Sequence, residues 1–191
     1  MRIITGSAKG TKLKTPRDSD LIRPTADRVK ESVFNVLGPR VLGAKVLDLF
    51  AGTGNLGLEA LSRGAKNAIF VDRSNLSVGL IRENAARTKL TDRVTIYRGD
   101  VLRILDKLAG SGDSFDLIFC DPPYNKGLVA AVLAKVDQTA LLAVDGIMIV
   151  EHSHQEAVKD EWDRLSLSRT LRYGDTLVSI FTTKQHKQQE G

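Results

Sequence analysis

The sequence lacks most of the features that mark secreted, metal-binding and membrane proteins. Its 191 residues contain a single cysteine, Cys120, which excludes an internal disulfide and any metal site built from several cysteines. No apolar run approaches the ~18 residues that a membrane-spanning helix needs, and the opening MRIITGSAKG contains no signal-peptide core. We therefore expect a cytoplasmic protein that has no metal ion and no membrane partner.

Acidic residues are scarce at the start of the chain, and the net charge of +5 is concentrated there. Residues 1–30 hold eight lysines or arginines against three aspartates, whereas the remaining residues carry equal numbers of both signs. A basic appendage on a neutral body is typical of a protein that binds a polyanion, although a solvated basic terminus would give the same pattern. The predicted contacts to nucleic-acid phosphates are Lys9, Lys12, Lys14 and Arg17.

Short β-prone runs alternate with helical patterns along most of the chain. Residues 2–5 and 11–14 flank a glycine-containing turn and predict a hairpin that can protrude, and a helix with Thr25 as its N-cap follows. Strands are predicted at residues 45–50, 67–71, 93–97, 115–120, 147–151, 165–171 and 176–182, and later helices at 75–88, 101–109 and 128–142. This alternation predicts an α/β fold with a doubly wound, mostly parallel, seven-stranded Rossmann-like sheet. We divide the chain into a hairpin extension (1–22), a main domain (23–183) and a polar tail (184–191).

A glycine loop follows the first predicted strand of this sheet. Gly52-Thr53-Gly54-Asn55-Leu56-Gly57 has the spacing G-x-G-x-x-G, and Asp72 follows 20 residues after Gly52, as in NAD-binding units. Asp48, just before the loop, would oppose a pyrophosphate but favour a cation, and S-adenosylmethionine carries a sulfonium and an ammonium. Gly57 fits helix–strand packing, and Asp72 could alternatively cap a helix. The loop favours S-adenosylmethionine over NAD but leaves both open.

The segment Asp121-Pro122-Pro123-Tyr124 ends the strand predicted at residues 115–120. An aryl amine is a poor nucleophile because its lone pair is delocalised, so an enzyme must position it and accept hydrogen bonds from its N–H groups. The Asp121 carboxylate and the Pro122 carbonyl can accept these bonds, and Tyr124 can stack on the base, which is worth roughly 1–3 kcal/mol. The alternative is a loop with a buried aspartate and a packing tyrosine.

These motifs together resemble those of amino-methyltransferases, whose motif I and motif IV are similar to DLFAGTG and DPPY here. The segments RPTADRVKESVFN, MRIITGSAKGTKL, GLEALSRGA, Glu151-His152 and RYGDT extend the resemblance to the bacterial small-subunit ribosomal RNA guanine-N2 methyltransferases, over nearly the whole chain. The resemblance implies a class I methyltransferase fold, S-adenosylmethionine as cofactor and a guanine amine as target. It also implies that Asp121 to Tyr124 position the guanine, and it assigns to the cofactor Thr25, Asp48, Phe50, Ala51, Gly52, Thr53, Gly54, Asp72, Arg73, Asp100 and Val101. Asn55 departs from the small residue common in that family.

Several readings compete with this one. Cys120 precedes the aspartate instead of following a proline, so we assign it to the core and not to a cytosine-C5 nucleophile. His152 and His154 without a third ligand do not predict a metal site. A DNA adenine or cytosine amino-methyltransferase would need a target-recognition domain for which this chain is short, and a non-catalytic RNA-binding assembly factor would not need DPPY. We expect a monomeric enzyme that acts on ribosomal RNA or a small-subunit assembly intermediate by direct displacement, without a metal or covalent intermediate.

Overall fold

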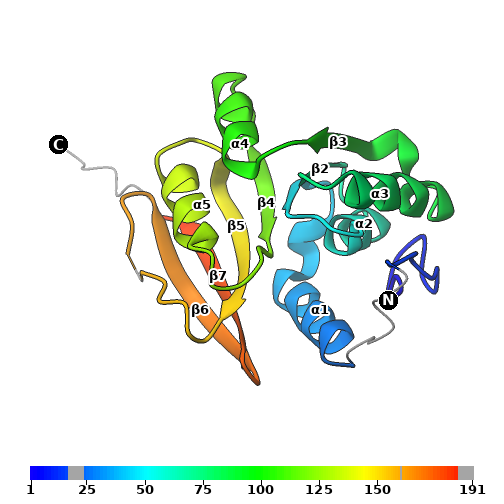
Figure 1. Ribbon diagram of the computed structural model, residues 1–191, viewed down its shortest axis with the longest axis horizontal. Helices are drawn as coiled ribbons and strands as arrows, with labels where there is room; N and C mark the ends of the chain where they lie inside the picture. The colour runs from blue at the N-terminus through cyan, green and yellow to red at the C-terminus, as the bar shows by residue number, and fades with distance from the viewer. Residues whose placement is uncertain (17–23, 160, 185–191) are drawn as a thin grey trace.

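A computed structural model describes residues 1–16, 24–159 and 161–184 (Figure 1). One sheet runs through it in the order β3-β2-β1-β4-β5-β7-β6. The strands are β1 (Lys45–Leu49), β2 (Asn67–Asp72), β3 (Val94–Arg98), β4 (Phe115–Cys120), β5 (Leu142–Ser153), β6 (Leu165–Tyr173) and β7 (Thr176–Thr183). Strands β1 to β5 pair in parallel, whereas β7 pairs antiparallel with both β5 and β6. This topology confirms the predicted doubly wound, seven-stranded sheet.

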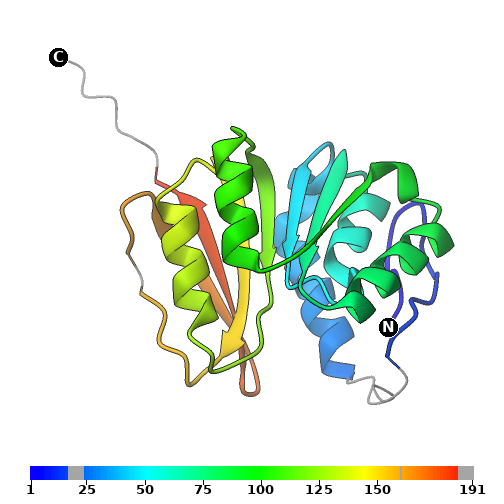
Figure 2. The ribbon, with the colours of Figure 1, turned by 45° about the horizontal axis from the view of Figure 1, so that its top comes forward.

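Helices cover both faces of the sheet (Figures 1 and 2). Their bounds are α1 (Pro24–Leu37), α2 (Asn55–Ser62), α3 (Asn75–Arg87), α4 (Val101–Gly110) and α5 (Leu128–Asp137), with short 3-10 turns at Gly38–Val41 and Thr91–Arg93. Apolar residues of α1, α2 and α3 share one core cluster, and those of α4 and α5 share the other, on the opposite face. The layers therefore bury the near-continuous apolar runs of the parallel strands, as both faces of such a sheet require.

The sheet reverses its winding beside β1. Strand β1 pairs with β2 on one side and with β4 on the other, so the connections that leave β1 and β4 diverge from each other. In doubly wound sheets this switch point opens a crevice at the carboxyl ends of the strands, where ligands bind. The glycine loop after β1 and the Asp121–Tyr124 segment after β4 both lie at this edge.

Two predicted features of the helices are wrong. Helix α1 begins at Pro24, so Thr25 lies within its first turn and is not the N-cap; proline is favoured in that turn because its missing N–H has no helical partner there. Helix α5 ends at Asp137, not at Leu142, and the Asp137 carboxylate anchors this end to the segment before β6 by accepting backbone N–H groups, including that of Leu165 at 2.8 Å. Leu142 instead begins β5, beside Phe115 of β4.

The N-terminal segment, residues 1–16, lies against the main domain. An antiparallel bridge joins Arg2 to Lys12, with Ile3 N–H donating to the Thr11 carbonyl at 3.0 Å. Ile3, Ala8 and Leu13 are buried in the same cluster as α1, α2 and α3. The predicted pairing is therefore present, but the segment packs on the body and does not protrude. Arg17 and most of the predicted 184–191 tail lie outside the described residues.

Candidate active site

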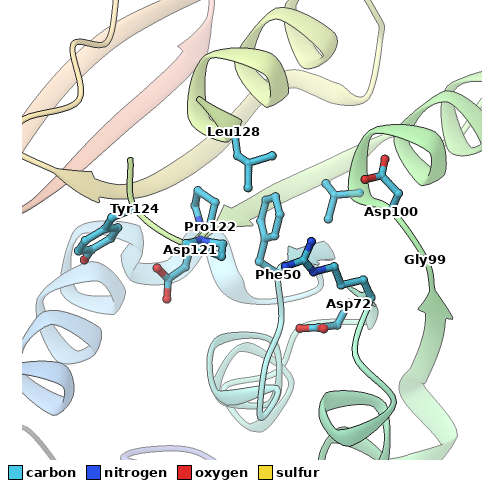
Figure 3. A pocket seen from close by; sticks show the side chains of 11 residues that line it. Phe50, Asp72, Gly99, Asp100, Asp121, Pro122, Tyr124 and Leu128 are labelled. Carbon is cyan, nitrogen blue, oxygen red and sulfur yellow. The ribbon is translucent and has the colours of Figure 1, made fainter. Parts of the chain in front are cut away.

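Two adjoining cavities open at the carboxyl ends of β1, β2 and β4. The larger, of about 430 Å³, lies between the ends of β2, β3 and β4 and is shown in Figure 3. The smaller, of about 310 Å³, lies between α1, the glycine loop and β5. Phe50 and Asp121 line both cavities, so the loop after β1 and the segment after β4 meet where the two spaces join.

The glycine loop after β1 turns sharply, and its glycines differ in their surroundings. Phe50 has a φ of 57°, an uncommon conformation for a residue with a side chain, and it aims its ring into the site. A Cβ on Gly52 would meet only the Phe50 carbonyl at 3.9 Å, so Gly52 faces open space. A Cβ on Gly54 would instead lie 3.3 Å from Leu58 and Phe70 in the core. The motif assigns Gly54 to the cofactor, but a side chain at this position would perturb the core.

Gly57 confirms the packing role that its spacing indicates. A Cβ there would lie 2.4 Å from the Phe70 ring and 3.0 Å from the Asp48 carboxylate, so helix α2 can approach β2 only through a glycine. The Gly57 N–H also donates to Asp48 at 2.8 Å. The third glycine thus fixes the helix against the strand and lets Asp48 hold its first turn.

Asp48 is a buried acid at the wall of the smaller cavity. Desolvation raises its pKa to about 7, against the lowering effect of the Gly57 hydrogen bond, and the nearby Asp72 carboxylate raises it further. Within the described part of the chain no cation forms an ion pair with it. A cation bound in this cavity would stabilise the ionised form.

Asp72 and Asp100 shape the larger cavity that they line. Asp72 accepts hydrogen bonds from Gly52 N–H at 2.9 Å and from Ser74 N–H at 2.8 Å, so it ties the glycine loop to the start of α3. Asp100 is the N-cap of α4 and accepts from Arg103 N–H at 3.2 Å. Arg73 and Val101 line the same space. The structure therefore brings together four of the residues that the resemblance assigns to the cofactor.

The Asp121 carboxylate faces both cavities and lies between Phe50 and Tyr124 in Figure 3. No residue that the structure describes donates a hydrogen bond to it, and the residue is exposed at the mouth of the crevice. Desolvation by the surrounding protein raises its pKa, and the carboxylates of Glu151 and Asp48 raise it further. An acid in this position is ready to accept N–H donors, and then a proton, from a ligand.

Tyr124 is held by its hydroxyl group. The hydroxyl donates to Glu151 Oε1 at 2.9 Å and lies 3.1 Å from Thr176 Oγ1, so the ends of β5 and β7 fix it. Desolvation is the main cause that raises the pKa of Tyr124. The side chain remains 38% exposed, which leaves the ring available for stacking. The sequence analysis named Glu151 and Thr176 only as parts of family motifs and gave neither a role; their position at the ends of β5 and β7 was the available signal.

A buried ion pair behind the glycine loop was also missed. Lys30 of α1 lines the smaller cavity, donates to Asn55 Oδ1 at 2.8 Å and to the Arg2 carbonyl at 2.5 Å, and lies 3.4 Å from Glu59. Burial lowers the pKa of Lys30, against the raising effect of Glu59. Asn55, unusual for the resembled family, therefore has a partner here. Nothing in the local sequence pattern pairs these three residues.

The remaining predicted residues differ in how they relate to the cavities: Cys120, Ala51 and Thr53 line the smaller one, whereas His152 lines neither. Cys120 is buried in the core, as predicted, and His152 is buried with its Nε2 2.9 Å from Ser179 Oγ. Ala51 and Thr53 line the smaller cavity, and the side chain of Thr25 lies outside the described part. Lys9 and Lys12 are exposed on the N-terminal segment, while Lys14 donates to Glu83 at 2.6 Å.

Across residues 1–16, 24–159 and 161–184, no group of three or more His, Cys, Asp or Glu side chains is placed to hold a metal ion. Within these ranges, no helix has the length and apolarity to cross a membrane.

Known proteins similar to this chain are methyltransferases. The family model described as "Conserved hypothetical protein 95" matches residues 1–182. The putative rRNA methyltransferase YlbH of Bacillus subtilis is 40% identical over 181 residues, which cover 95% of this chain and 98% of that protein. Ribosomal RNA small subunit methyltransferase D of Escherichia coli K12 is 36% identical, with coverages of 95% and 89%. The structure of the putative methyltransferase yhhF from Escherichia coli superposes with a TM-score of 0.85 at 30% identity, over 96% of this chain and 98% of that one.

Proposed function

Because the chain belongs to the family described as conserved hypothetical protein 95, we propose that it methylates the exocyclic N2 amine of a guanine in small-subunit ribosomal RNA, with S-adenosylmethionine as donor. One observation carries the proposal: Asp121 presents an unpartnered carboxylate where the two cavities join. The names of the two relatives, which describe methyltransferases of ribosomal RNA, support the substrate class. The proposed enzyme acts in the cytoplasm, as a monomer, on free RNA or on a small-subunit assembly intermediate.

The residues of both cavities fit S-adenosylmethionine. Carboxylates such as Asp72 accept hydrogen bonds from ribose hydroxyls, and Asp100 with Val101 offers an edge for an adenine. The buried acid Asp48 suits the positive charges of the methionine part, and it would repel a pyrophosphate. When bound, this cofactor supplies an electrophilic methyl group.

The protein's own residues prepare the amine. The Asp121 carboxylate and the Pro122 carbonyl accept hydrogen bonds from the two N–H groups, which orients the nitrogen lone pair towards the point where the cavities meet. As the nitrogen forms its new bond to carbon it loses a proton, and Asp121 takes that proton. The raised pKa of Asp121 suits this step, because a more basic carboxylate is the better proton acceptor. Tyr124 holds the base plane by stacking.

The test is methyl transfer to small-subunit ribosomal RNA from cells that lack the gene. We expect wild-type protein to form N2-methylguanosine, identified by mass spectrometry of the digested RNA. Asp121→Ala should keep its fold and its affinity for S-adenosylhomocysteine but lose about 10²–10³-fold in single-turnover rate, because a transition-state acceptor is gone. Asp113→Ala, an exposed aspartate before β4, is the matched control and should behave as wild type. A near-normal single-turnover rate of methyl transfer by Asp121→Ala would contradict this mechanism.

A non-catalytic assembly factor is distinguished by the same assay. Such a protein would bind the RNA and leave the methyl group of a radiolabelled donor in solution. An adenine or cytosine amino-methyltransferase would instead give N6-methyladenosine or N4-methylcytidine in the digest. Either product would replace the guanine assignment.

A further inference from the structure

Glu151 is a second acid beside the target site. It lies at the carboxyl end of β5, the strand that neighbours β4, and it pairs with Val178 of β7. Its side chain lines the smaller cavity together with Asp121. The segment after β4 and the end of β5 therefore present two carboxylates to one space.

Most acceptor positions on these two acids are unused. Tyr124 donates to Glu151 Oε1 at 2.9 Å, and in the described ranges no residue donates to Glu151 Oε2 or to either oxygen of Asp121. Asp121 is exposed and Glu151 is half-buried, so a ligand can reach their free oxygens, and the two acids lie close enough for Glu151 to raise the pKa of Asp121. A ligand that brings several N–H donors side by side would pair with both carboxylates and relieve the repulsion between them.

Guanine has such an edge. Its ring N1–H stands beside the two N–H bonds of the N2 amine, which gives three donors in a row. Adenine and cytosine have an unprotonated ring nitrogen next to their amine, and its lone pair would face a carboxylate oxygen. A pair of acids therefore favours guanine over both other amine-bearing bases.

We infer that Glu151 accepts a hydrogen bond from guanine N1–H while Asp121 accepts from the N2 amine, so that Glu151 selects the base. This inference rests on the proposed guanine-N2 activity. The Tyr124 hydroxyl, itself 3.1 Å from Thr176, is a positioning group: it holds one oxygen of Glu151 and leaves the other for the base.

The experiment replaces guanine by 2-aminopurine, which keeps the methylatable amine but has an acceptor at N1. Ribosomal RNA carrying either base at the mapped target nucleotide can be made by splinted ligation and assembled into the substrate. Wild-type protein should prefer guanine in kcat/KM by at least about 100-fold. In Glu151→Gln the side-chain amide can donate to N1 of 2-aminopurine, so this preference should fall by at least about tenfold.

Two further variants separate base selection from a structural effect. Tyr124→Phe keeps the ring but frees Glu151, so it should also lower the preference, by less than Glu151→Gln. Glu156→Gln changes the same residue type in the turn after β5, where Glu156 accepts from Ser153 N–H at 3.3 Å, and should leave the preference unchanged.

The outcomes distinguish the inference from the function on which it rests. If Glu151→Gln slows both substrates equally and the preference stays at the wild-type value, Glu151 does not read N1 and the inference is wrong, while guanine-N2 methylation stands. If wild-type protein forms no N2-methylguanosine, the proposed function fails and the role of Glu151 in guanine selection fails with it.

Discussion

Asp48 serves the fold and the cavity with the same carboxylate. It accepts the Gly57 N–H at 2.8 Å, which orients the first turn of α2, and it borders the smaller cavity. Burial holds its pKa at about 7 in the free protein, so near neutral pH a large fraction of the molecules carry it uncharged. The sequence argument for a cation site assumed a permanent charge; the structure makes that charge depend on pH and on the ligand.

This dependence predicts a pH effect on cofactor affinity. A bound cation favours ionised Asp48, so binding releases a proton, and affinity for S-adenosylmethionine should rise as pH increases from 6 to 8. Asp48→Asn keeps an acceptor for Gly57 N–H but should bind more weakly at pH 8 and show a flatter pH profile. Titration calorimetry in buffers of different ionisation enthalpy measures both affinity and proton release.

Stability should change in the opposite direction with pH. The folded-state pKa of Asp48 lies above its ordinary value of 3.8, so the native state binds the extra proton and loses stability as pH rises from about 4 to 7. Asp48→Asn should remove this part of the stability profile. If the affinity of Asp48→Asn for S-adenosylmethionine depends on pH as that of the wild type does, another titrating group responds to the bound cation.

At the scale of elements, Glu59 of α2 joins three parts of the chain. Its carboxylate accepts the backbone N–H of Ile4 at 2.7 Å and of Thr5 at 3.1 Å, and it pairs with Arg63 at 2.7 Å and buried Lys30 at 3.4 Å. Thr53 of the glycine loop also donates to the sulfur of Met1 at 3.3 Å, and Met1 lines the smaller cavity. The N-terminal segment therefore supports the loop that it covers.

Glu59→Gln should destabilise the protein and weaken cofactor binding together. The change leaves Lys30 buried without its counter-charge, which costs about 3–5 kcal/mol in comparable cases. Because the N-terminal segment and glycine loop share this support, affinity for S-adenosylhomocysteine should fall as well. Urea unfolding and calorimetry measure the two effects.

The matched control is Glu83→Gln. Glu83 pairs with Lys14 on the surface, where both side chains are about half exposed, so its loss should cost no more than about 1 kcal/mol. If the two variants unfold at the same urea concentration, the buried pair contributes little and the N-terminal segment is held by its apolar residues.

The sequence predicted elements better than the contacts between them. Strand β4 matches its predicted bounds, because the apolar run ends at Asp121-Pro122-Pro123 and the prolines, which lack a backbone N–H, cannot continue the strand pairing. Helix α5 was predicted five residues too long, and the hydrogen bond from Leu165 N–H to Asp137 at its end is a tertiary contact with no local signal. The same reason hid the Lys30–Glu59 pair. In the site, the motifs identified Asp121 and Asp72 as lining residues. They did not indicate that a side chain at Gly54 would face the core.

On the scale of the whole molecule, charge and shape decide where RNA can bind. The body is neutral and the basic residues gather near the N-terminus, on a segment that packs against α2 and α3. Lys9 and Lys12 are exposed there, whereas Lys14 is already paired with Glu83. The predicted phosphate contacts therefore differ in what they can contribute: Lys14 must break an ion pair before it can bind a phosphate.

Replacing Lys9 and Lys12 by alanine should weaken RNA binding and flatten its salt dependence. Each lost phosphate contact lowers the log–log slope of affinity against salt by about 0.7–0.9, and Lys14→Ala should add less than either. Neither Lys9 nor Lys12 lines either of the two cavities of the site, so affinity for S-adenosylhomocysteine should stay at the wild-type value. Filter binding at several salt concentrations measures the slope.

If the double variant binds and methylates normally at physiological salt, the segment supports only the fold and the glycine loop. The phosphate contacts would then belong to the rim of the crevice, where Lys126 is exposed two residues after Tyr124.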